Sequence, residues 1–400
     1  MPLRPLLLLL AMSPLCHAGA PDQAPALRVA TYNVSLNHDE AGGLIAQLEG
    51  DHLPARQVAA VIQRVRPDLL LLNEFDHDAD GRAARLFVER YLGQGQFGES
   101  AIAYPHVYAA PVNTGVPSGL DLDGDGRTDG PGDAWGFGRH PGQYGMLVLS
   151  RHPIDRAAVR TFQQLRWSAL PGALAPLDAK TGKPWYPAEV WSQLRLSSKS
   201  HWDVPVETPQ GRLHFLVAHP TPPVFDGPED RNGRRNHDEI RLWAEYVSGQ
   251  DLPWLCDDAG HCGGLPTDAR FIIAGDYNAD PADGDSHGAA ILQLLEHPRL
   301  LRHPTPRSEG AIIAARDNEA EHRHRGNPAH DTGNFGPRTG NLRIDYVLPS
   351  VGFSVLQSGV FWPPPDAPEA PWIEASDHRM VWLDIVVPSA ATPAARKPAP

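Results

Sequence analysis

The chain has 400 residues, 41% of them hydrophobic, and a formal net charge of -13 at pH 7. This hydrophobic content is enough for a core, and the length allows one large domain or two. The charge excludes an overall basic surface that would attract nucleic acid, although a local basic patch with a divalent cation can still hold a phosphodiester. The 41 prolines and 37 glycines are spread along the chain rather than gathered in a linker, which favours one loop-rich domain.

Residues 1–20 have the pattern of a secretory signal peptide. Arg4 precedes an apolar run over residues 6–12, and small residues end the segment at Ala18, Gly19 and Ala20. The run is shorter than the roughly 20 residues that a membrane-spanning helix needs, and no later segment is long enough. We therefore expect a cleaved leader and a secreted or periplasmic protein without a transmembrane segment.

The next elements alternate between strand and helix. An apolar run over residues 28–32 ends in Asn33, and residues 57–65 have helical spacing that stops before Pro67. The run over residues 69–72 then leads into Asn73 and Glu74. Strand, helix and strand in so short a stretch indicate a layered α/β arrangement.

An acidic loop follows at residues 121–129. Asp121, Asp123, Asp125 and Asp129 stand at positions 1, 3, 5 and 9 of a calcium-loop pattern. The loop departs from an EF-hand because Gly132 stands where the pattern has glutamate, and no flanking helices are evident. We expect a structural Ca²⁺ ion here; the alternative is a solvated acidic turn.

Later strands are predicted at residues 144–149, 213–218, 270–274, 342–348 and 379–387, consistent with a mixed, mostly antiparallel sandwich. A polar segment at residues 197–203 contains Lys199 and His201, which suit a phosphate or a substrate head group. Its alternative is an ordinary connection with Trp202 packed inward.

A basic cluster stands near the start of a predicted helix through residues 237–243: Arg231, Arg234, Arg235 and Arg241. Arg231 and Arg235 are candidate substrate contacts. The alternative is a solvated helix face whose arginines pair with acids four residues away. The role of the histidine-rich segment 322–331 is open, with His330 or Asp331 a candidate substrate contact near the mouth of a site.

Two cysteines remain after removal of the leader, Cys256 and Cys262. In an exported chain, a close pair predicts a small disulfide that holds a loop. With only His261 nearby, the pair makes a poor zinc site.

Polar residues suited to metal or phosphate stand at the ends of five predicted strands. The glycine-led turn after residues 271–274 carries Asp276 and Asn278, and His219 follows residues 215–218. Asn33 and Glu74 end the first two strands, and Asp377 and His378 precede the last. A single such turn is weak evidence because Asp and Asn also close ordinary turns. Five together predict one site.

These residues resemble, in order, motifs of the endonuclease/exonuclease/phosphatase superfamily, which includes deoxyribonuclease I. The matching motifs, over residues 27–387, are Thr31-Tyr32-Asn33, Asn73-Glu74, His219-Pro220, Gly275-Asp276-Tyr277-Asn278, Arg343-Ile344-Asp345-Tyr346-Val347 and Ser376-Asp377-His378. The resemblance implies a four-layer α/β sandwich, with two mixed, mostly antiparallel sheets flanked by helices. It also implies metal-dependent hydrolysis of phosphate esters. Residues 388–400 then form a Pro/Ala-rich tail that is expected to be disordered.

The resemblance also implies roles for single residues. Glu74 becomes the main ligand of Mg²⁺ or Mn²⁺, with Asp377 as a second ligand and Asn33 as an orienting amide at the metal. The general base becomes His378, oriented by Asp345.

The resemblance implies that the remaining motif residues act on the attacking water and the phosphate. By this resemblance, Asp276 is expected to position the water and Asn278 to orient phosphate or nucleophile. His219 is expected to hydrogen-bond the phosphate or protonate the leaving oxygen.

The acidic charge favours a small phosphate ester, phospholipid head group or inositol phosphate over long DNA as substrate. An extracellular nuclease acting on DNA or RNA is the alternative. A non-catalytic binding module on the same fold would lack one of the matched acids or histidines, and none is missing. No stable protein partner is implied.

Overall fold

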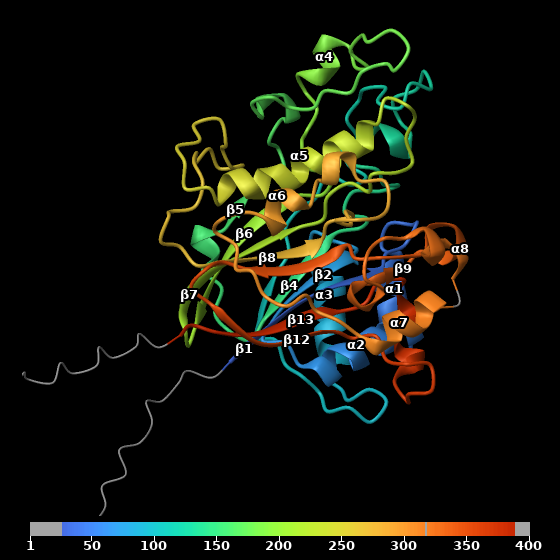
Figure 1. Ribbon diagram of the computed structural model, residues 1–400, viewed down its shortest axis with the longest axis vertical. Coiled ribbons are helices and arrows are strands. Elements are labelled where there is room, and N and C mark those ends of the chain that lie inside the picture. The colour runs from blue at the N-terminus through green and yellow to red at the C-terminus, as the bar shows by residue number, and fades with distance from the viewer. Residues whose placement is uncertain (1–25, 317, 389–400) are drawn as a thin grey trace, which may run out of the picture.

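The computed structural model describes residues 26–316 and 318–388. The predicted leader and residues 389–400 of the predicted tail lie outside these described residues. Two large sheets, of six and five strands, form the centre of the molecule, with helices on their outer faces (Figure 1). In the described part of the chain, no helix is long and apolar enough to cross a membrane.

The first sheet contains β1 (Leu27–Leu36), β2 (Leu69–Phe75), β3 (His106–Tyr108), β4 (Met146–Ser150), β12 (Ser354–Val360) and β13 (Val381–Val386). Its strand order is β12-β13-β1-β2-β4-β3. β1 and β2 are parallel, and the other neighbours are antiparallel. The carboxyl ends of β1 and β2 therefore lie side by side at one edge of the sheet.

The second sheet contains β5 (Arg160–Thr161), β6 (His201–Thr208), β7 (Gly211–Ala218), β8 (Phe271–Asp276) and β11 (Asp345–Pro349). Its strand order is β11-β8-β7-β6-β5, with β7 and β8 parallel. A separate two-stranded ladder pairs β9 (Gly333–Asn334) with β10 (Asn341–Leu342).

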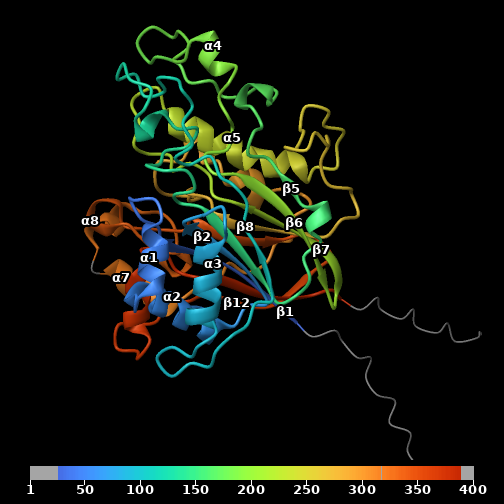
Figure 2. The ribbon, with the colours of Figure 1, turned by 180° about the vertical axis from the view of Figure 1, so that it is seen from behind.

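The helices are α1 (Gly43–Glu49), α2 (Leu53–Val65), α3 (Arg82–Leu86), α4 (Ala188–Trp191), α5 (Arg231–Tyr246), α6 (Leu292–Leu295), α7 (Glu309–Arg316) and α8 (Gly336–Thr339). α1, α2 and α3 cover the outer face of the first sheet, as the reverse view shows (Figure 2). α5 and α6 cover the second sheet. The order helices, sheet, sheet, helices confirms the predicted four-layer α/β sandwich.

The strands read as continuous apolar runs because both of their faces are buried. On β2, Leu69 and Leu71 pack between the two sheets, whereas Leu70 and Leu72 pack under the helices. On β7, Phe215 points between the sheets in the same way. This alternation fixes the register of each strand and hence the position of the polar residue at its end.

Two expectations about local structure need correction. The helix predicted at residues 57–65 begins four residues earlier, at Leu53, with Pro54 in its first turn. The segment 197–203 is only partly a polar loop, because His201, Trp202 and Asp203 begin β6. Trp202 is fully buried between the sheets, as expected for the alternative in which this segment is a connection with Trp202 packed inward.

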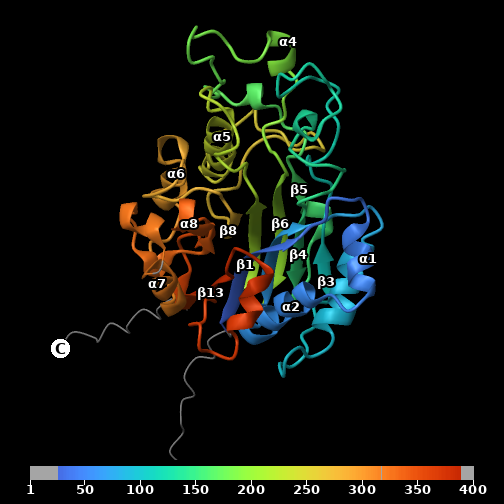
Figure 3. The same ribbon diagram turned by 90° about the vertical axis from the view of Figure 1, so that its right-hand side faces the viewer.

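Long loops lie at one end of the molecule, beyond α5 (Figures 1 and 3). They comprise residues 109–145, between β3 and β4, and residues 162–200, between β5 and β6 and including α4. These loops form the outer part of the cavity described below.

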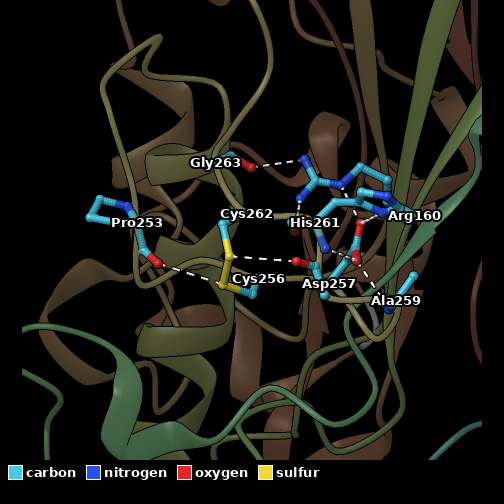
Figure 4. Close-up of a disulfide and its surroundings, with 9 residues drawn as sticks. Arg160, Pro253, Cys256, Asp257, Ala259, His261, Cys262 and Gly263 are labelled. Carbon is cyan, nitrogen blue, oxygen red and sulfur yellow. Dashed lines mark hydrogen bonds and ion pairs between the residues drawn. A yellow bond between two sulfur atoms is a disulfide. The ribbon is translucent and has the colours of Figure 1, made fainter.

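A disulfide joins Cys256 and Cys262 in the loop that follows α5 (Figure 4). Between the two cysteines, Asp257 accepts a hydrogen bond from Nε of Arg160 at 2.7 Å. The same arginine donates to the backbone oxygens of His261 and Gly263. These contacts tie the loop to β5, away from the polar strand ends.

Candidate active site

The polar residues at the strand ends meet at one edge of the two sheets. Asn33 and Glu74 lie near the carboxyl ends of β1 and β2, and Asp276 ends β8. Asp345 begins β11 directly opposite Asp276 in the antiparallel ladder. His378 lies just before β13, so the cluster draws side chains from both sheets.

Asn33 connects the acids of the cluster. Its amide nitrogen donates to Oε1 of Glu74 and to Oδ2 of Asp276, each at 3.0 Å, and lies 3.4 Å from Nε2 of His378. Its amide oxygen accepts a hydrogen bond from the backbone N–H of Ser35 at 3.2 Å. Asn33 therefore presents a donor to the cluster here, and its role as a metal ligand stays a prediction.

A second amide holds the other oxygen of Glu74. Asn37 donates to Oε2 of Glu74 at 3.1 Å. With Asn33 on Oε1, both carboxylate oxygens of Glu74 have one amide partner. A carboxylate oxygen has more than one acceptor position, so each oxygen keeps room for a further interaction.

His378 forms a hydrogen-bonded chain with two other side chains. Its Nδ1 lies 2.9 Å from Oδ2 of Asp345, which also accepts a hydrogen bond from the hydroxyl of Thr332 at 2.8 Å. Its Nε2 lies 3.6 Å from Oδ2 of Asp276. Phe335 packs edge-on against the imidazole ring, with centroids 5.3 Å apart. The ring is thus oriented with Nε2 toward the cluster.

His219 and Asn278 complete the cluster on the side of the second sheet. Nε2 of His219 lies 3.4 Å from Oδ2 of Asp276. The backbone N–H of Asn278 donates to Oδ1 of Asp276 at 2.9 Å, and its side chain donates to the carbonyl of Pro220 at 3.1 Å. Asn278 therefore ties the turn after β8 to the segment after β7.

Two residues of the cluster hold unusual backbone conformations. Glu74 has φ 56° and Asn278 has φ 51°, both in the left-handed region. Such a conformation costs about 1–3 kcal/mol outside glycine and persists only where the surroundings enforce it. Next to them, Gly275 has no room for a side chain, since a Cβ would lie 2.1 Å from the carbonyl of Ala218. The backbone is therefore shaped to present these side chains.

The donor set fits a divalent cation. Ligand atoms of Glu74, His219 and Asp276 all lie within 4.8 Å of one another, as do those of Asp276, Asp345 and His378. Carboxylate oxygens suit hard cations such as Mg²⁺ and Mn²⁺. Burial raises the pKa of Glu74 and of Asp276, because a carboxylate removed from water is less stable in its charged form.

Asp377 belongs to neither of these two groups among the described residues. Its Oδ1 lies 3.9 Å from Nε2 of His378, and its side chain is 53% exposed. Its role as a second metal ligand stays a prediction.

The two histidines of the cluster have opposite acid–base properties. Burial lowers the pKa of His219 well below its ordinary value, and the nearby charge of Lys199 acts in the same direction. Burial alone would also lower the pKa of His378, but the carboxylates of Asp345 and Asp276 outweigh it and raise the pKa. His378 therefore holds a proton much more readily than His219 does.

The cluster forms the inner wall of a cavity of about 1090 Å³. Glu74, His219, Asp276, Asn278, Asp377 and His378 line its inner end. Its outer part is lined by the long loops and by residues 221–225. The volume reaches the upper end of the range for small-molecule sites, roughly 300–1,000 Å³.

Lys199 lines this cavity and is 6% exposed. Its ammonium makes no hydrogen bond or ion pair with any of the described residues. Burial lowers its pKa, while the charges of Glu239, Glu74 and Asp276 act in the opposite direction. Lys199 thus brings an unpartnered cation close to the acids of the cluster.

The other three candidate substrate contacts are held by the protein itself. Arg231 lines the cavity and is ion-paired with Glu229. Arg235 also lines it, but its guanidinium donates to four backbone carbonyls. His201 is fully buried, does not line the cavity, and has Ser197 and the carbonyl of Glu239 against its two ring nitrogens. The structure gives no support to substrate contact by His201.

Three acids of the loop at 121–129 converge as predicted. Ligand atoms of Asp121, Asp123 and Asp125 lie within 4.8 Å of one another. Asp129 lies outside this group, with its carboxylate 3.0 Å from the guanidinium of Arg127. Asp123 also lines the cavity next to the cluster, so the loop borders the candidate site.

No residue of the histidine-rich segment lines the cavity, although the backbone N–H groups of Arg325 and Gly326 donate to Asp283, which does. His330 lines a separate, much smaller pocket with Arg343, and Asp331 is buried. Burial and neighbouring acids raise the pKa of Asp331 to about 8. Neither residue lines the cavity next to the cluster, which disfavours the expected substrate contact.

Sequence reasoning missed three supporting residues. Asn37 holds Glu74, and Thr332 holds Asp345. Glu239 on α5 is buried and accepts the backbone N–H groups of Ser198 and Thr221, which line the cavity. The sequence does not reveal that Glu239 is buried and accepts hydrogen bonds, because a carboxylate in an amphipathic helix is usually a solvated surface residue.

Comparison with protein families finds one match. The model of the Endonuclease/Exonuclease/phosphatase family matches residues 30–378, which span every residue of the cluster. No curated protein matches the sequence.

Comparison with solved structures finds matches at low sequence identity. An endonuclease/exonuclease/phosphatase from Beutenbergia cavernae is 20% identical with a TM-score of 0.51, covering 92% of this chain and 72% of that one. Sphingomyelinase C from Streptomyces griseocarneus is 17% identical with a TM-score of 0.47, covering 90% and 99%. A mannosyl-6-phosphatase from Bacteroides thetaiotaomicron is 15% identical with a TM-score of 0.45, covering 90% and 99%.

Proposed function

Because this chain belongs to the endonuclease/exonuclease/phosphatase family, whose members hydrolyse phosphate esters, we propose that it is an exported, divalent-metal-dependent phosphoesterase. The observation that carries the proposal is the convergence of Glu74, Asp276 and the His378–Asp345 pair at the end of one cavity. A phosphate ester is anionic and repels a nucleophile, so its hydrolysis needs charge neutralisation, a base and stabilisation of the leaving oxygen. The cluster offers residues for each task.

Glu74 is the principal metal ligand in this proposal, with Asp377 as a second ligand and Asn33 as an orienting amide at the metal. A bound Mg²⁺ or Mn²⁺ ion supplies neutralisation of the phosphoryl oxygens. Asn37 and Asn33 hold the carboxylate of Glu74 in one orientation, as groups behind a metal ligand commonly do.

His378 is the general base. Asp345 fixes its ring so that Nε2 faces the cluster and can take a proton from the attacking water. Asp276, 3.6 Å from this nitrogen, positions the water, and Asn278 orients the phosphate. His219, whose Nε2 lies 3.4 Å from Oδ2 of Asp276, hydrogen-bonds the phosphate or protonates the leaving oxygen.

Charge in the cavity supports a small ester rather than a polynucleotide. Outside the cluster, the lining acids are Asp123, Asp280, Asp283 and Asp285. Arg231 and Arg235 are already engaged by the protein. Neighbouring phosphates of a nucleic acid would therefore meet negative charge.

Export is supported by the leader pattern at residues 1–20 and by the disulfide, since disulfides persist in oxidising compartments.

The test is hydrolysis by the mature protein of bis-4-nitrophenyl phosphate, 4-nitrophenyl phosphate, sphingomyelin, inositol phosphates, RNA and plasmid DNA. Each is measured with Mg²⁺, Mn²⁺, Ca²⁺ or EDTA. We expect turnover of a small ester that EDTA abolishes. Faster turnover of DNA or RNA would favour the extracellular nuclease. No turnover of any substrate would favour the non-catalytic binding module.

We further propose that Lys199 contacts the phosphate. A charge-assisted hydrogen bond is worth about 1.5–3 kcal/mol, so Lys199→Met should lower kcat/KM by roughly 10–150-fold. It should also raise the inhibition constant of inorganic phosphate. Lys183→Met, at an exposed position, is the matched control and should change neither value. Equal constants for both variants would remove Lys199 from the site.

We also propose that Asp121, Asp123 and Asp125 bind a structural Ca²⁺ ion. Binding to the folded state alone raises stability, so millimolar Ca²⁺ should raise the melting temperature by roughly 2 °C or more. Asp123→Ala should abolish this rise, and Glu74→Ala should keep it, because Glu74 belongs to the other cluster. A rise that persists in Asp123→Ala would assign the calcium effect to another site.

A further inference from the structure

The outer part of the catalytic cavity has an apolar lining that hydrolysis of a phosphate does not require. We call it the apolar subsite and define it by Phe137, Trp167, Tyr186, Leu194 and Phe225, all of which line the cavity. Trp167 and Leu194 are buried in the cluster under the loops, with Tyr186 packed against it. Both of its phenylalanines are exposed.

Phe225 is 88% exposed, the highest fraction among the exposed large apolar residues. Its backbone has φ 65°, in the left-handed region that non-glycine residues rarely adopt. Both features are unfavourable for a loop residue without a partner. A strained conformation at an exposed aromatic residue is a reason to look for a functional contact.

The loop is fixed on both sides of Phe225. The side chain of Asn232 donates to the carbonyl of Val224 at 2.7 Å, and its backbone N–H donates to Oδ2 of Asp226 at 2.6 Å. Asn232 lies in the first turn of α5, so the loop is anchored to a long helix. Phe225 is therefore held outward by its neighbours.

Phe137 is 60% exposed and comes from the loop between β3 and β4. The preceding Gly136 lies against the segment of Lys199, where a Cβ would be 1.9 Å from the carbonyl of Ser198. Gly136 also donates to the carbonyl of Asn113 at 3.1 Å. This second phenylalanine is thus also carried by a loop tied down beside the cavity.

Trp167 and Tyr186 are the large aromatic residues of the apolar subsite that the fold holds in place. The indole N–H of Trp167 donates to Oδ2 of Asp238 on α5 at 2.7 Å, which fixes the ring. Tyr186 lies close enough to Arg235 and Arg231 for their charges to act on it. The N–H groups of Arg235 are engaged by backbone carbonyls, and Arg231 is ion-paired with Glu229.

We propose that the apolar subsite binds an uncharged, apolar organic group of a phosphate ester that carries a single phosphate. The inference rests on the proposed function and names its substrate class. The reacting phosphate lies at the inner cluster, and the apolar group extends along Trp167 toward Phe225 and Phe137. The acids that line the rest of the cavity disfavour a second phosphate.

Two diesters with one leaving group test this: methyl 4-nitrophenyl phosphate and hexyl 4-nitrophenyl phosphate, both kept below the concentration at which the hexyl ester aggregates. In each, water oxygen bonds to phosphorus and the bond to the nitrophenyl oxygen breaks, giving 4-nitrophenol and an alkyl phosphate. Wild type should prefer the hexyl ester in kcat/KM by about tenfold or more, because the additional methylene groups leave water.

Phe225→Ala should lower this hexyl-to-methyl ratio by about threefold or more, since an exposed aromatic contact is removed. Leu356→Ala is the matched control, since Leu356 is 58% exposed on β12 and does not line the cavity. It should leave the ratio unchanged. Melting temperatures of both variants verify that the fold is kept.

The outcomes separate this inference from the proposed function. No metal-dependent turnover of either ester would overturn the proposed function itself. Turnover of both with a ratio within about twofold would leave that function standing and overturn the apolar subsite. An unchanged ratio in Phe225→Ala, together with weaker binding to phosphatidylcholine vesicles, would assign Phe225 to a lipid surface and also overturn it.

Discussion

Replacing Glu74 with glutamine should reduce metal-dependent kcat/KM by about 10³-fold or more. A Lewis-acidic cation is worth several kcal/mol of transition-state stabilisation, and about 1.36 kcal/mol corresponds to tenfold in rate. Glutamine keeps the length of the side chain and one acceptor for Asn33, but it removes the charge that binds the cation. Turnover of the best substrate in the panel, with saturating Mg²⁺ or Mn²⁺, is the measurement.

Metal binding separates this effect from damage to the fold. Titration with Mn²⁺ should show weaker binding to Glu74→Gln than to wild type, while circular dichroism should be unchanged. Glu40→Gln is the matched control, because Glu40 is exposed and follows the same strand β1. Full activity and unchanged Mn²⁺ affinity in Glu74→Gln would remove Glu74 from the metal site.

Replacing His378 with glutamine should lower kcat by roughly 10²–10⁴-fold, the usual contribution of a positioned acid–base group. Glutamine can still donate a hydrogen bond to Asp345, but it cannot take a proton from water at neutral pH. His378 is 4% exposed and packs against Phe335, so glutamine also fills more of the space than alanine would. The rate is measured at saturating substrate.

His322→Gln serves as the control, since His322 is exposed and lies outside the cavity. It should retain wild-type kcat. A loss of less than tenfold in His378→Gln, with an unchanged melting temperature, would show that another group accepts the proton.

The fold was predictable because its signals are local. Apolar runs such as residues 69–72 are continuous because both faces of the strands are buried, and helical spacing at residues 57–65 needs no partner to be seen. The motif at Gly275–Asn278 was predictable for the same reason, because a tight turn after a buried strand requires particular residue types at adjacent positions. The layered α/β arrangement followed from these patterns, and the four layers followed from the resemblance of the motifs to the family.

The sequence did not predict the orientation of side chains whose surroundings come from distant segments of the chain. For the segment 197–203 the sequence left two alternatives open, a polar loop that binds substrate and a connection with Trp202 packed inward. In the structure, β6 begins in this segment and places Trp202 between the sheets, while Lys199 lines the cavity. In the sequence, Lys199 and His201 are equally good candidates for contact with a phosphate. Packing against β7 and α5 decides that Lys199 lines the cavity and that His201 lies in the core.

By itself, the sequence determined the strands, their polar ends and the set of acids and histidines that chemistry requires. Tertiary structure alone decided which of these side chains meet. Asn33 and Asp276 lie 243 positions apart along the chain, yet they are joined by a hydrogen bond of 3.0 Å because the two sheets pack face to face. The sequence also did not predict the exposed Phe225 or the apolar subsite. The exposure of a side chain depends on which segments pack around it, and folding alone decides that.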